Sequence, residues 1–111
     1  MESNEIKKII PFDDIWDNLN VLEERLLEIS SSSNDYLTSI SQYLINAGGK
    51  RFRPIVTSLA GKFGNEIENI GKIIDAGVCV ELIHIGSLYH DDVMDNATTR
   101  RGVESSNSKW N

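Results

Sequence analysis

Apolar residues recur along this chain at spacings of three and four residues, the period at which side chains share one face of an α-helix. The first run spans residues 14–30, with Asp13 as a candidate N-cap and an acidic opposite face. The sequence SSSN then interrupts it, and Asn34 can cap a second helix that runs to the glycines at 48 and 49. The apolar faces of these two helices comprise Ile15, Trp16, Leu19, Leu22, Leu26, Ile29, Leu37, Ile40 and Leu44.

Two more helices are predicted in the second half of the chain. Pro54 suits a first helical turn, where its missing N–H needs no partner, and the pattern continues to Gly64. The longest helix is predicted from about Glu66 to about Asn96, and it is so apolar after Asp75 that neighbours should cover most of its surface. The chain is therefore predicted to be all-α. Because 111 residues can hardly bury such a helix, we expect a fragment of a larger bundle or a partner that supplies further helices.

The charge of the chain is unevenly distributed. Residues 1–35 hold nine acidic and three basic side chains, whereas residues 36–111 hold eight of each, and the net charge is −6. Five of the eight basic residues in the second part fall in two clusters. Such clustering favours a specific anion over nucleic acid or a membrane surface, which would require a spread basic surplus. The clustered residues are Lys50, Arg51, Arg53, Arg100 and Arg101.

The remaining composition indicates the compartment. The single cysteine, Cys79, lies in an apolar run and is predicted to be a buried, reduced thiol. No segment is apolar for long enough to be a transmembrane helix, and the N-terminal sequence MESNEIKK has no apolar signal core. These features predict a cytoplasmic protein.

Three carboxylates crowd the end of the longest predicted helix, in the sequence HDDVMD. Asp91 and Asp95 share a helical face because they are four residues apart, and Asp92 flanks them. The partial negative charge of a helix C-terminus increases their repulsion. Oxygen ligands without cysteine favour Mg²⁺ or Ca²⁺, and Mg²⁺ often binds one or two carboxylates together with substrate phosphates. The alternative is a solvated acidic helix end.

Two arginines follow the carboxylates almost at once. Arg100 and Arg101 come within six residues of Asp95, in a segment that can turn back over the same cavity. The planar guanidinium group suits phosphate oxygens. The alternative is an ion pair with the aspartates, although that would explain one arginine better than two.

A second basic cluster lies in GGKRFRP, residues 48–54. Lys50 and Arg53 are three residues apart and lie next to Pro54, where a helix is predicted to begin. Because a helix N-terminus favours anions, these cations indicate a diphosphate site. A Walker A loop is excluded because position 44 is leucine and Arg51 follows the lysine. The alternative is a loop of solvated basic residues.

The two histidines are interpreted differently. His84 lies seven residues before Asp91 and therefore on nearly the same helical face, which makes it a candidate ligand. His90 is interpreted as a core residue with satisfied hydrogen bonds.

The motifs GGKRFRP, ELIHIGSLYHDDVMDNATTRRG and SKWN, in this order, resemble the N-terminal part of the trans-polyprenyl diphosphate synthases, the all-helical enzymes of isoprenoid chain elongation. The resemblance covers residues 34–111. It implies that residues 1–111 form a single partial domain, the N-terminal helices of an isoprenoid-synthase-type bundle. It also implies a Mg²⁺-dependent prenyltransferase that condenses isopentenyl diphosphate with an allylic prenyl diphosphate, and a homodimer at full length.

The resemblance implies a role for each matching position. Asp91 and Asp95, supported by Asp92, would hold Mg²⁺ on the allylic diphosphate, which Arg100 would contact. No role is implied for Arg51. The residues implied for isopentenyl diphosphate are Lys50, Arg53, His84 and Arg101.

Product length and activity can also be inferred from the resemblance. In the family, bulky residues four and five positions before the first aspartate stop chain growth early, so the small Gly86 and Ser87 imply a medium-chain or long-chain product. Members also carry a second aspartate-rich motif that these 111 residues do not include, so we expect negligible synthase activity from them alone. Two alternatives remain: a non-catalytic small subunit of a heteromeric synthase, or a terpene-cyclase-like lyase, a class without a counterpart of GGKRFRP.

Overall fold

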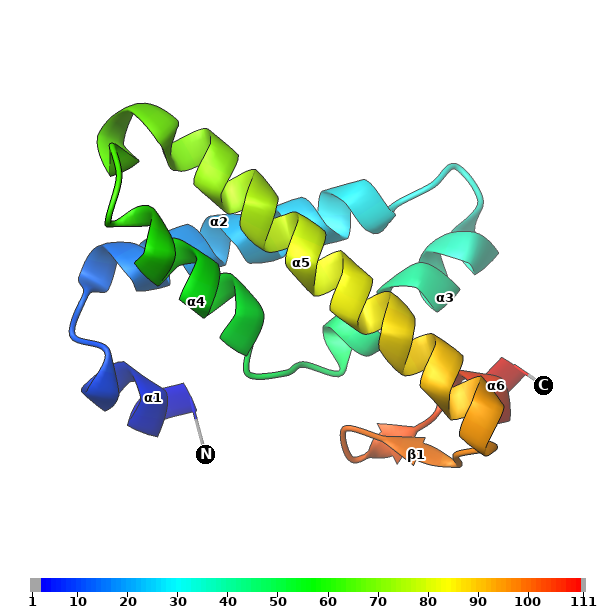
Figure 1. Ribbon diagram of the computed structural model, residues 1–111. Coiled ribbons are helices and arrows are strands. Elements are labelled where there is room, and N and C mark those ends of the chain that lie inside the picture. Colours follow the sequence, from blue (N-terminus) through cyan, green and yellow to red (C-terminus); the bar gives the residue numbers. More distant parts are fainter. Residues whose placement is uncertain (1–2, 111) are drawn as a thin grey trace.

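The computed structural model describes residues 3–110, which form six α-helices and one short β-hairpin (Figure 1). The strands β1 (Thr99–Arg100) and β2 (Val103–Glu104) pair antiparallel. The predicted all-α class is confirmed, since the hairpin contributes only four strand residues within the described part of the chain. The helices are α1 (Ser3–Ile9), α2 (Asp13–Ser30), α3 (Asp35–Asn46), α4 (Phe52–Gly61), α5 (Glu66–Asp95) and α6 (Ser106–Trp110).

The predicted helix boundaries are only partly correct. Asn34 caps α3, because its side-chain oxygen accepts hydrogen bonds from the backbone N–H groups of residues 36 and 37. Pro54 lies in the first turn of α4, as predicted. Asp13 is not an N-cap: it is the first residue of α2, and Phe12 precedes it in an extended conformation. Helix α4 ends at Gly61 instead of Gly64, because the next backbone N–H groups bond to carbonyls three residues back and tighten the chain into a turn.

The longest helix, α5, runs diagonally across the molecule, with α4 beside it and α2 crossing behind it (Figure 1). One buried cluster joins α2, α3 and α5. The helical period correctly placed Leu22, Leu26 and Leu44 on inward faces, but it did not include Ile45, which is also buried. Ile29 and Leu37, from the same predicted faces, are more than half exposed. The cluster consists of Leu22, Leu26, Leu44, Ile45, Val78 and Ile85.

The C-terminal half of α3 is attached to α5 by a tyrosine hydroxyl. Tyr89 donates a hydrogen bond to the backbone oxygen of Ile40 at 2.6 Å and accepts one from the backbone N–H of Leu44 at 3.2 Å. Both partners belong to α3, one turn apart. This bridge sets the position of the helix end from which the glycine-containing loop at 47–51 leaves.

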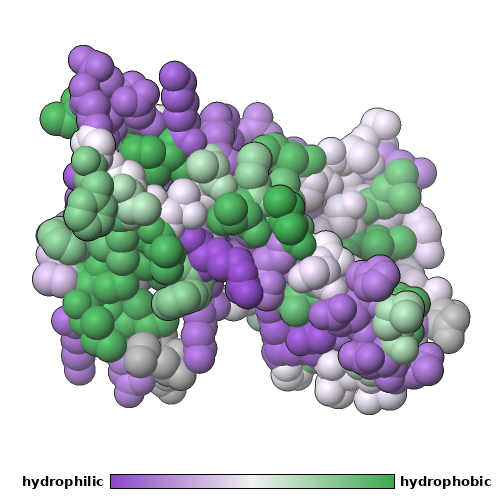
Figure 2. All heavy atoms as spheres, in the orientation of Figure 1, coloured by the Kyte–Doolittle hydropathy of each residue, from purple (hydrophilic) through white to green (hydrophobic). Residues whose placement is uncertain are grey.

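The opposite face of α5 is uncovered in the described part of the chain. Ile83 is 73% exposed and Met94 is 68% exposed, and Figure 2 shows apolar side chains at the surface over α4 and α5. Two predictions are wrong here: Cys79 is exposed, and His90 has 73% of its side-chain surface exposed. The reason is that α2 and α4 pack against the other side of α5.

The end of the chain packs against α3. Trp110 of α6 meets the ring of Tyr43 edge to face, with the ring centroids 5.0 Å apart. Asn111, the last residue of the predicted SKWN motif, lies outside the described residues. Among the described helices, none is both long enough and apolar enough to span a membrane.

Candidate functional site

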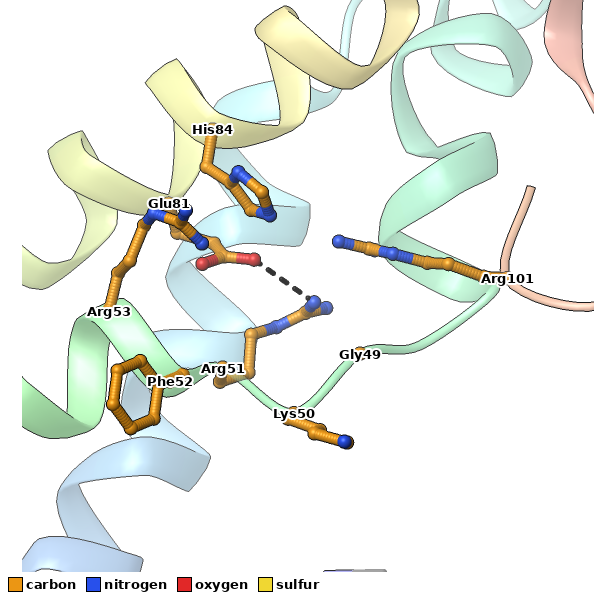
Figure 3. Close-up of a pocket in the computed structure, with 8 residues that line it drawn as sticks. All are labelled: Gly49, Lys50, Arg51, Phe52, Arg53, Glu81, His84 and Arg101. Carbon is orange, nitrogen blue, oxygen red and sulfur yellow. Dashed lines mark hydrogen bonds and ion pairs between the residues drawn. The ribbon is translucent and has the colours of Figure 1, made fainter. Parts of the chain in front are cut away.

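A pocket of about 350 Å³ lies where the glycine-containing loop, the start of α4, the middle of α5 and the hairpin turn meet (Figure 3). The structure brings together in this pocket all four residues that the resemblance implies for isopentenyl diphosphate, although they come from three separate segments of the chain. The lining residues are Gly49, Lys50, Arg51, Phe52, Arg53, Glu81, His84 and Arg101.

The backbone of the loop determines which of its side chains enter the protein. Arg51 has a left-handed backbone (φ 53°), directly before α4, and its residue surface is only 5% exposed. Its neighbours Lys50 and Arg53 are exposed. In Figure 3 the side chain of Lys50 extends away from the centre of the pocket. The loop therefore buries Arg51 and keeps Lys50 at the pocket rim, where Arg53 joins it from the first turn of α4.

Buried Arg51 is held by two carboxylates. Its Nε and Nη2 donate to the two oxygens of Glu23 on α2, at 2.5 and 3.2 Å. Its Nη1 donates to Glu81 of α5 at 3.2 Å, and Glu81 is only 2% exposed. The sequence reasoning missed both glutamates and assigned no role to Arg51. The available signal was Glu81 itself, a charged residue inside the apolar run of α5, three positions before His84.

Arg101 reaches the pocket from the hairpin turn. Like Arg51 it has a left-handed backbone (φ 53°), and its Nη1 donates to the backbone oxygens of Leu44, at 2.9 Å, and Gly48. Burial and the nearby charge of Arg51 lower the pKa of Arg101 from its ordinary value. Arginine still remains protonated, so the guanidinium group presents a fixed positive charge beside the loop.

His84 faces this positive charge (Figure 3). Burial is the main cause that lowers its pKa below the ordinary 6.5, and the charges of Arg53 and Arg101 add to it, while Glu81 opposes them. The imidazole is therefore neutral at neutral pH in this structure. A bound anion would offset the arginines and favour its protonation.

The acidic cluster at the end of α5 is divided between two environments. Asp92 has no exposed side-chain surface, and its Oδ1 accepts hydrogen bonds from Nε and Nη2 of Arg100 at 3.0 and 2.6 Å. This hydrogen bond raises the pKa of Arg100. The alternative of an ion pair with the aspartates is thus correct for Arg100. Arg101 instead lines the basic pocket. Asp91 and Asp95 remain exposed.

The exposed carboxylates fit part of a magnesium site. Asp91 and Asp95 are hard oxygen ligands one turn apart, and Mg²⁺ commonly takes one or two carboxylates and leaves its other positions to water and phosphate. Among residues 5–110, no three His, Cys, Asp or Glu side chains are grouped so that they could hold a metal ion. The donor set therefore fits an ion shared with a phosphate ligand, and not a closed protein site.

The two residues predicted to affect product length lie between the pocket and the carboxylates. Gly86 and Ser87 are exposed on α5, and the Ser87 hydroxyl donates to the backbone oxygen of His84 at 2.6 Å. Ser87 also lines a second hollow, of about 310 Å³, together with Arg53 and Ile83. This hollow shares Arg53 and His84 with the basic pocket, so it continues that pocket along α5.

Known proteins are similar to this chain in sequence and in fold. The sequence model described as Polyprenyl synthetase matches residues 34–111. The chain is 43% identical over 88 residues to nonaprenyl diphosphate synthase of Mycobacterium tuberculosis, which covers 78% of this chain and 26% of that protein. It is 37% identical over 107 residues to heptaprenyl diphosphate synthase component 2 of Bacillus subtilis, which covers 96% of this chain and 30% of that protein.

The fold is similar to a solved structure as well. The crystal structure of heptaprenyl diphosphate synthase from Staphylococcus aureus matches 86% of this chain and 30% of that chain, with a TM-score of 0.81 and 33% sequence identity. The chain thus spans between about a quarter and a third of the length of these relatives. On the family match and these relatives, the chain belongs to the polyprenyl synthetase family.

Proposed function

We propose that this chain carries the isopentenyl diphosphate pocket and the first magnesium-binding carboxylates of a prenyltransferase that makes a medium-chain or long-chain trans-polyprenyl diphosphate. The observation that supports it most is the convergence of Lys50, Arg53, His84 and Arg101 on one pocket. Nothing in the local sequence requires these segments to meet. A pocket with several cations and one buried carboxylate suits a compact, highly charged anion such as diphosphate.

Each residue of the pocket has a distinct task in this proposal. Lys50 and Arg53, which are exposed at the rim, contact the diphosphate oxygens first. Arg101, which is already held by backbone carbonyls, presents its guanidinium with little loss of conformational entropy. His84 takes up a proton as the anion binds and then donates a hydrogen bond to it.

The carboxylate end of α5 serves the allylic substrate. Asp91 and Asp95 would hold Mg²⁺, and the bound ion would supply positive charge to the diphosphate leaving group. Arg100 contacts the same diphosphate. Asp92, which the resemblance suggested as a supporting metal ligand, orients Arg100 by accepting hydrogen bonds from its Nε and Nη2, so that Nη1 is directed away from the pair.

The reaction itself is a head-to-tail condensation. The allylic C–O bond breaks with both electrons leaving on diphosphate, the double bond of isopentenyl diphosphate attacks the resulting carbocation, and loss of one proton forms the new double bond. The basic pocket holds isopentenyl diphosphate during these steps. The small Gly86 and Ser87 leave room beside α5 for the growing hydrocarbon chain, which favours a longer product.

The names of the relatives agree with this proposal. Nonaprenyl and heptaprenyl diphosphate synthases are named for long products. The Bacillus subtilis relative is named as component 2 of its synthase, so a heteromeric assembly competes with the homodimer that the resemblance implies. Sedimentation of the complete enzyme would decide between the two. We also expect the 111 residues alone to incorporate no labelled isopentenyl diphosphate into product.

The pocket can be tested without turnover and without metal. Isothermal titration calorimetry of the 111-residue chain should detect binding of inorganic pyrophosphate, and Lys50→Met and Arg53→Met should each weaken it by about tenfold. Lys72→Met removes the same charge from an exposed position near the start of α5 and serves as the matched control. Absence of binding, or equal effects of Lys72→Met and Lys50→Met, would rule out the proposed pocket.

A further inference from the structure

Arg51 lines the pocket, yet almost all of its hydrogen-bonding capacity is used by the protein. A guanidinium group has five N–H donors. Four of them are engaged: two by Glu23, one by Glu81 and one by the backbone oxygen of Ile45, at 3.1 Å. A side chain in this state has at most one N–H left for a ligand. We propose that Arg51 is a positioning residue of the diphosphate pocket and not one of its ligands, an inference that rests on the proposed function.

The partners of Arg51 lie in three different helices. Glu23 belongs to α2, Ile45 to the end of α3 and Glu81 to the middle of α5, while Arg51 itself directly precedes α4. The guanidinium group therefore ties the loop to each of these helices. Lys50 lies one position before Arg51 and Arg53 lies two positions after it. The hydrogen bonds of Arg51 therefore determine the positions of Lys50 and Arg53 relative to α5.

Glu81, the partner of Arg51 on α5, lies close to His84. The two residues are three positions apart on α5, so they lie on the same side of the helix, and both line the pocket. Figure 3 shows the Arg51–Glu81 ion pair beneath the imidazole. Holding Arg51 against Glu81 thus holds the loop cations at a defined separation from His84.

The charges of this cluster also argue against a ligand role. Two carboxylates, Glu23 and Glu81, contact one guanidinium group, so the cluster as a whole carries no positive charge to offer an anion. Arg51 instead keeps buried Glu81 from standing unpaired beside an anion site, where it would repel the ligand. The positive field of the pocket comes from Lys50, Arg53 and Arg101.

Gly49 provides the space in which this cluster meets Arg101. A Cβ at Gly49 would lie 2.9 Å from Nη1 of Arg51, closer than real Cβ atoms approach other heavy atoms, and 3.1 Å from Cζ of Arg101, which is tighter than most Cβ contacts. Its φ of +155° also disfavours a side chain. The two guanidinium groups therefore converge at a loop position that has no side chain to separate them.

The experiment is a charge-balanced double variant, Arg51→Met/Glu81→Gln, titrated with inorganic pyrophosphate at several salt concentrations. It removes one positive and one negative charge, so a change in affinity does not arise from net charge. We expect binding to weaken by about tenfold, because the loop cations lose their fixed position. We expect the salt dependence to stay as in the unaltered chain, whereas Lys50→Met should reduce it, because Lys50 contacts the anion and Arg51 does not.

Two further variants separate positioning from loss of folding. Ile15→Ala removes a buried side chain of α2 that lies outside the cluster of Leu44 and Ile45, so it destabilises the fold and should leave pyrophosphate affinity unchanged in the folded chain. Arg51→Lys keeps the charge but lacks the planar fork, and it should bind pyrophosphate several-fold more weakly than the unaltered chain.

The outcomes distinguish this inference from the function on which it rests. If the unaltered chain binds pyrophosphate through Lys50, but the double variant and Arg51→Lys bind it equally well, Arg51 has no positioning role and the proposed function stands. A reduced salt dependence in the double variant would make Arg51 a direct ligand and overturn the inference. If the unaltered chain does not bind pyrophosphate, both proposals fail.

Discussion

Arg100 and Asp92 form a two-point ion pair that joins strand β1 to the last turns of α5, with Nη2 of Arg100 2.6 Å from Oδ1 of Asp92. The pair places a cation at the C-terminal end of a helix, where the partial negative charge favours it. It also removes one of three neighbouring carboxylates from the surface. The crowding of Asp91, Asp92 and Asp95 in the sequence is therefore partly relieved within the protein.

Loss of this pair should destabilise the fold. Asp92→Asn leaves the guanidinium of Arg100 without its charged partner at a fully buried side-chain position, and we expect a loss of about 2 kcal/mol in the free energy of unfolding. Urea denaturation followed by circular dichroism measures it. Asp91→Asn is the matched control, because 61% of the Asp91 side chain is exposed. Equal losses in the two variants would show that the ion pair contributes no net stability.

The protonation of His84 should make both stability and binding depend on pH. Its pKa is lowered by burial and by Arg53, so just below pH 6.5 the unfolded chain binds more protons than the folded chain. The stability should therefore fall as the pH drops through this window, and the fall should be smaller in His84→Gln. Urea denaturation at about pH 7.5 and about pH 5.5 compares the two.

The same imidazole should respond to the anion. Proton NMR on His90→Gln, in which His84 is the only remaining histidine of the chain, should give a pKa that rises when pyrophosphate is added. A pKa unaffected by pyrophosphate would show that His84 does not face the anion site.

The two loop glycines should differ in their effect on the pocket. Gly49→Ala places a methyl group against the guanidinium groups of Arg51 and Arg101, whereas Gly48→Ala meets open space. Both positions have positive φ, so both variants share a backbone cost of about 1 kcal/mol. Only Gly49→Ala should also weaken pyrophosphate binding, which calorimetry would detect. Similar affinities for the two variants would contradict the convergence of the guanidinium groups at Gly49.

The hydroxyl bridge between α5 and α3 should contribute measurably to stability. Tyr89→Phe removes the group that bonds to Ile40 and Leu44 and leaves both backbone partners to find others. We expect the free energy of unfolding to fall by about 1–3 kcal/mol. Tyr36→Phe alters a tyrosine that is 58% exposed and should have no such effect. If thermal denaturation gave the same midpoint for both variants, the bridge would be energetically neutral.

Product length should respond to the size of residue 87. In an active synthase that contains this segment, Ser87→Phe would fill the hollow beside Ile83 and should shift the product toward shorter chains. Chromatography of the products measures the shift. Ser41→Phe adds the same bulk at an exposed position of α3 and should leave the product unchanged. Unchanged product length in Ser87→Phe would show that another residue terminates chain growth.

Much of the helical architecture could be predicted from the sequence. The extent of α5 agrees with its predicted limits to within a residue, and Asn34 caps α3 as its side chain suggested. These features depend on residues within a few positions of one another, through the helical period and local hydrogen bonds. The hairpin at 99–104 and the short helices α1 and α6 were not predicted, because their segments are too short to show a period.

The sequence by itself determined the helical class and the residue types that could bind a diphosphate and a divalent cation. Only the tertiary structure decided which charges pair: Arg100 with Asp92, and Arg51 with Glu81, thirty positions away. It also decided that Cys79 and His90 lie on the uncovered face of α5. The physical reason is that local periodicity defines the faces of a helix, whereas packing against α2 and α4 selects which face is buried and which distant side chains meet.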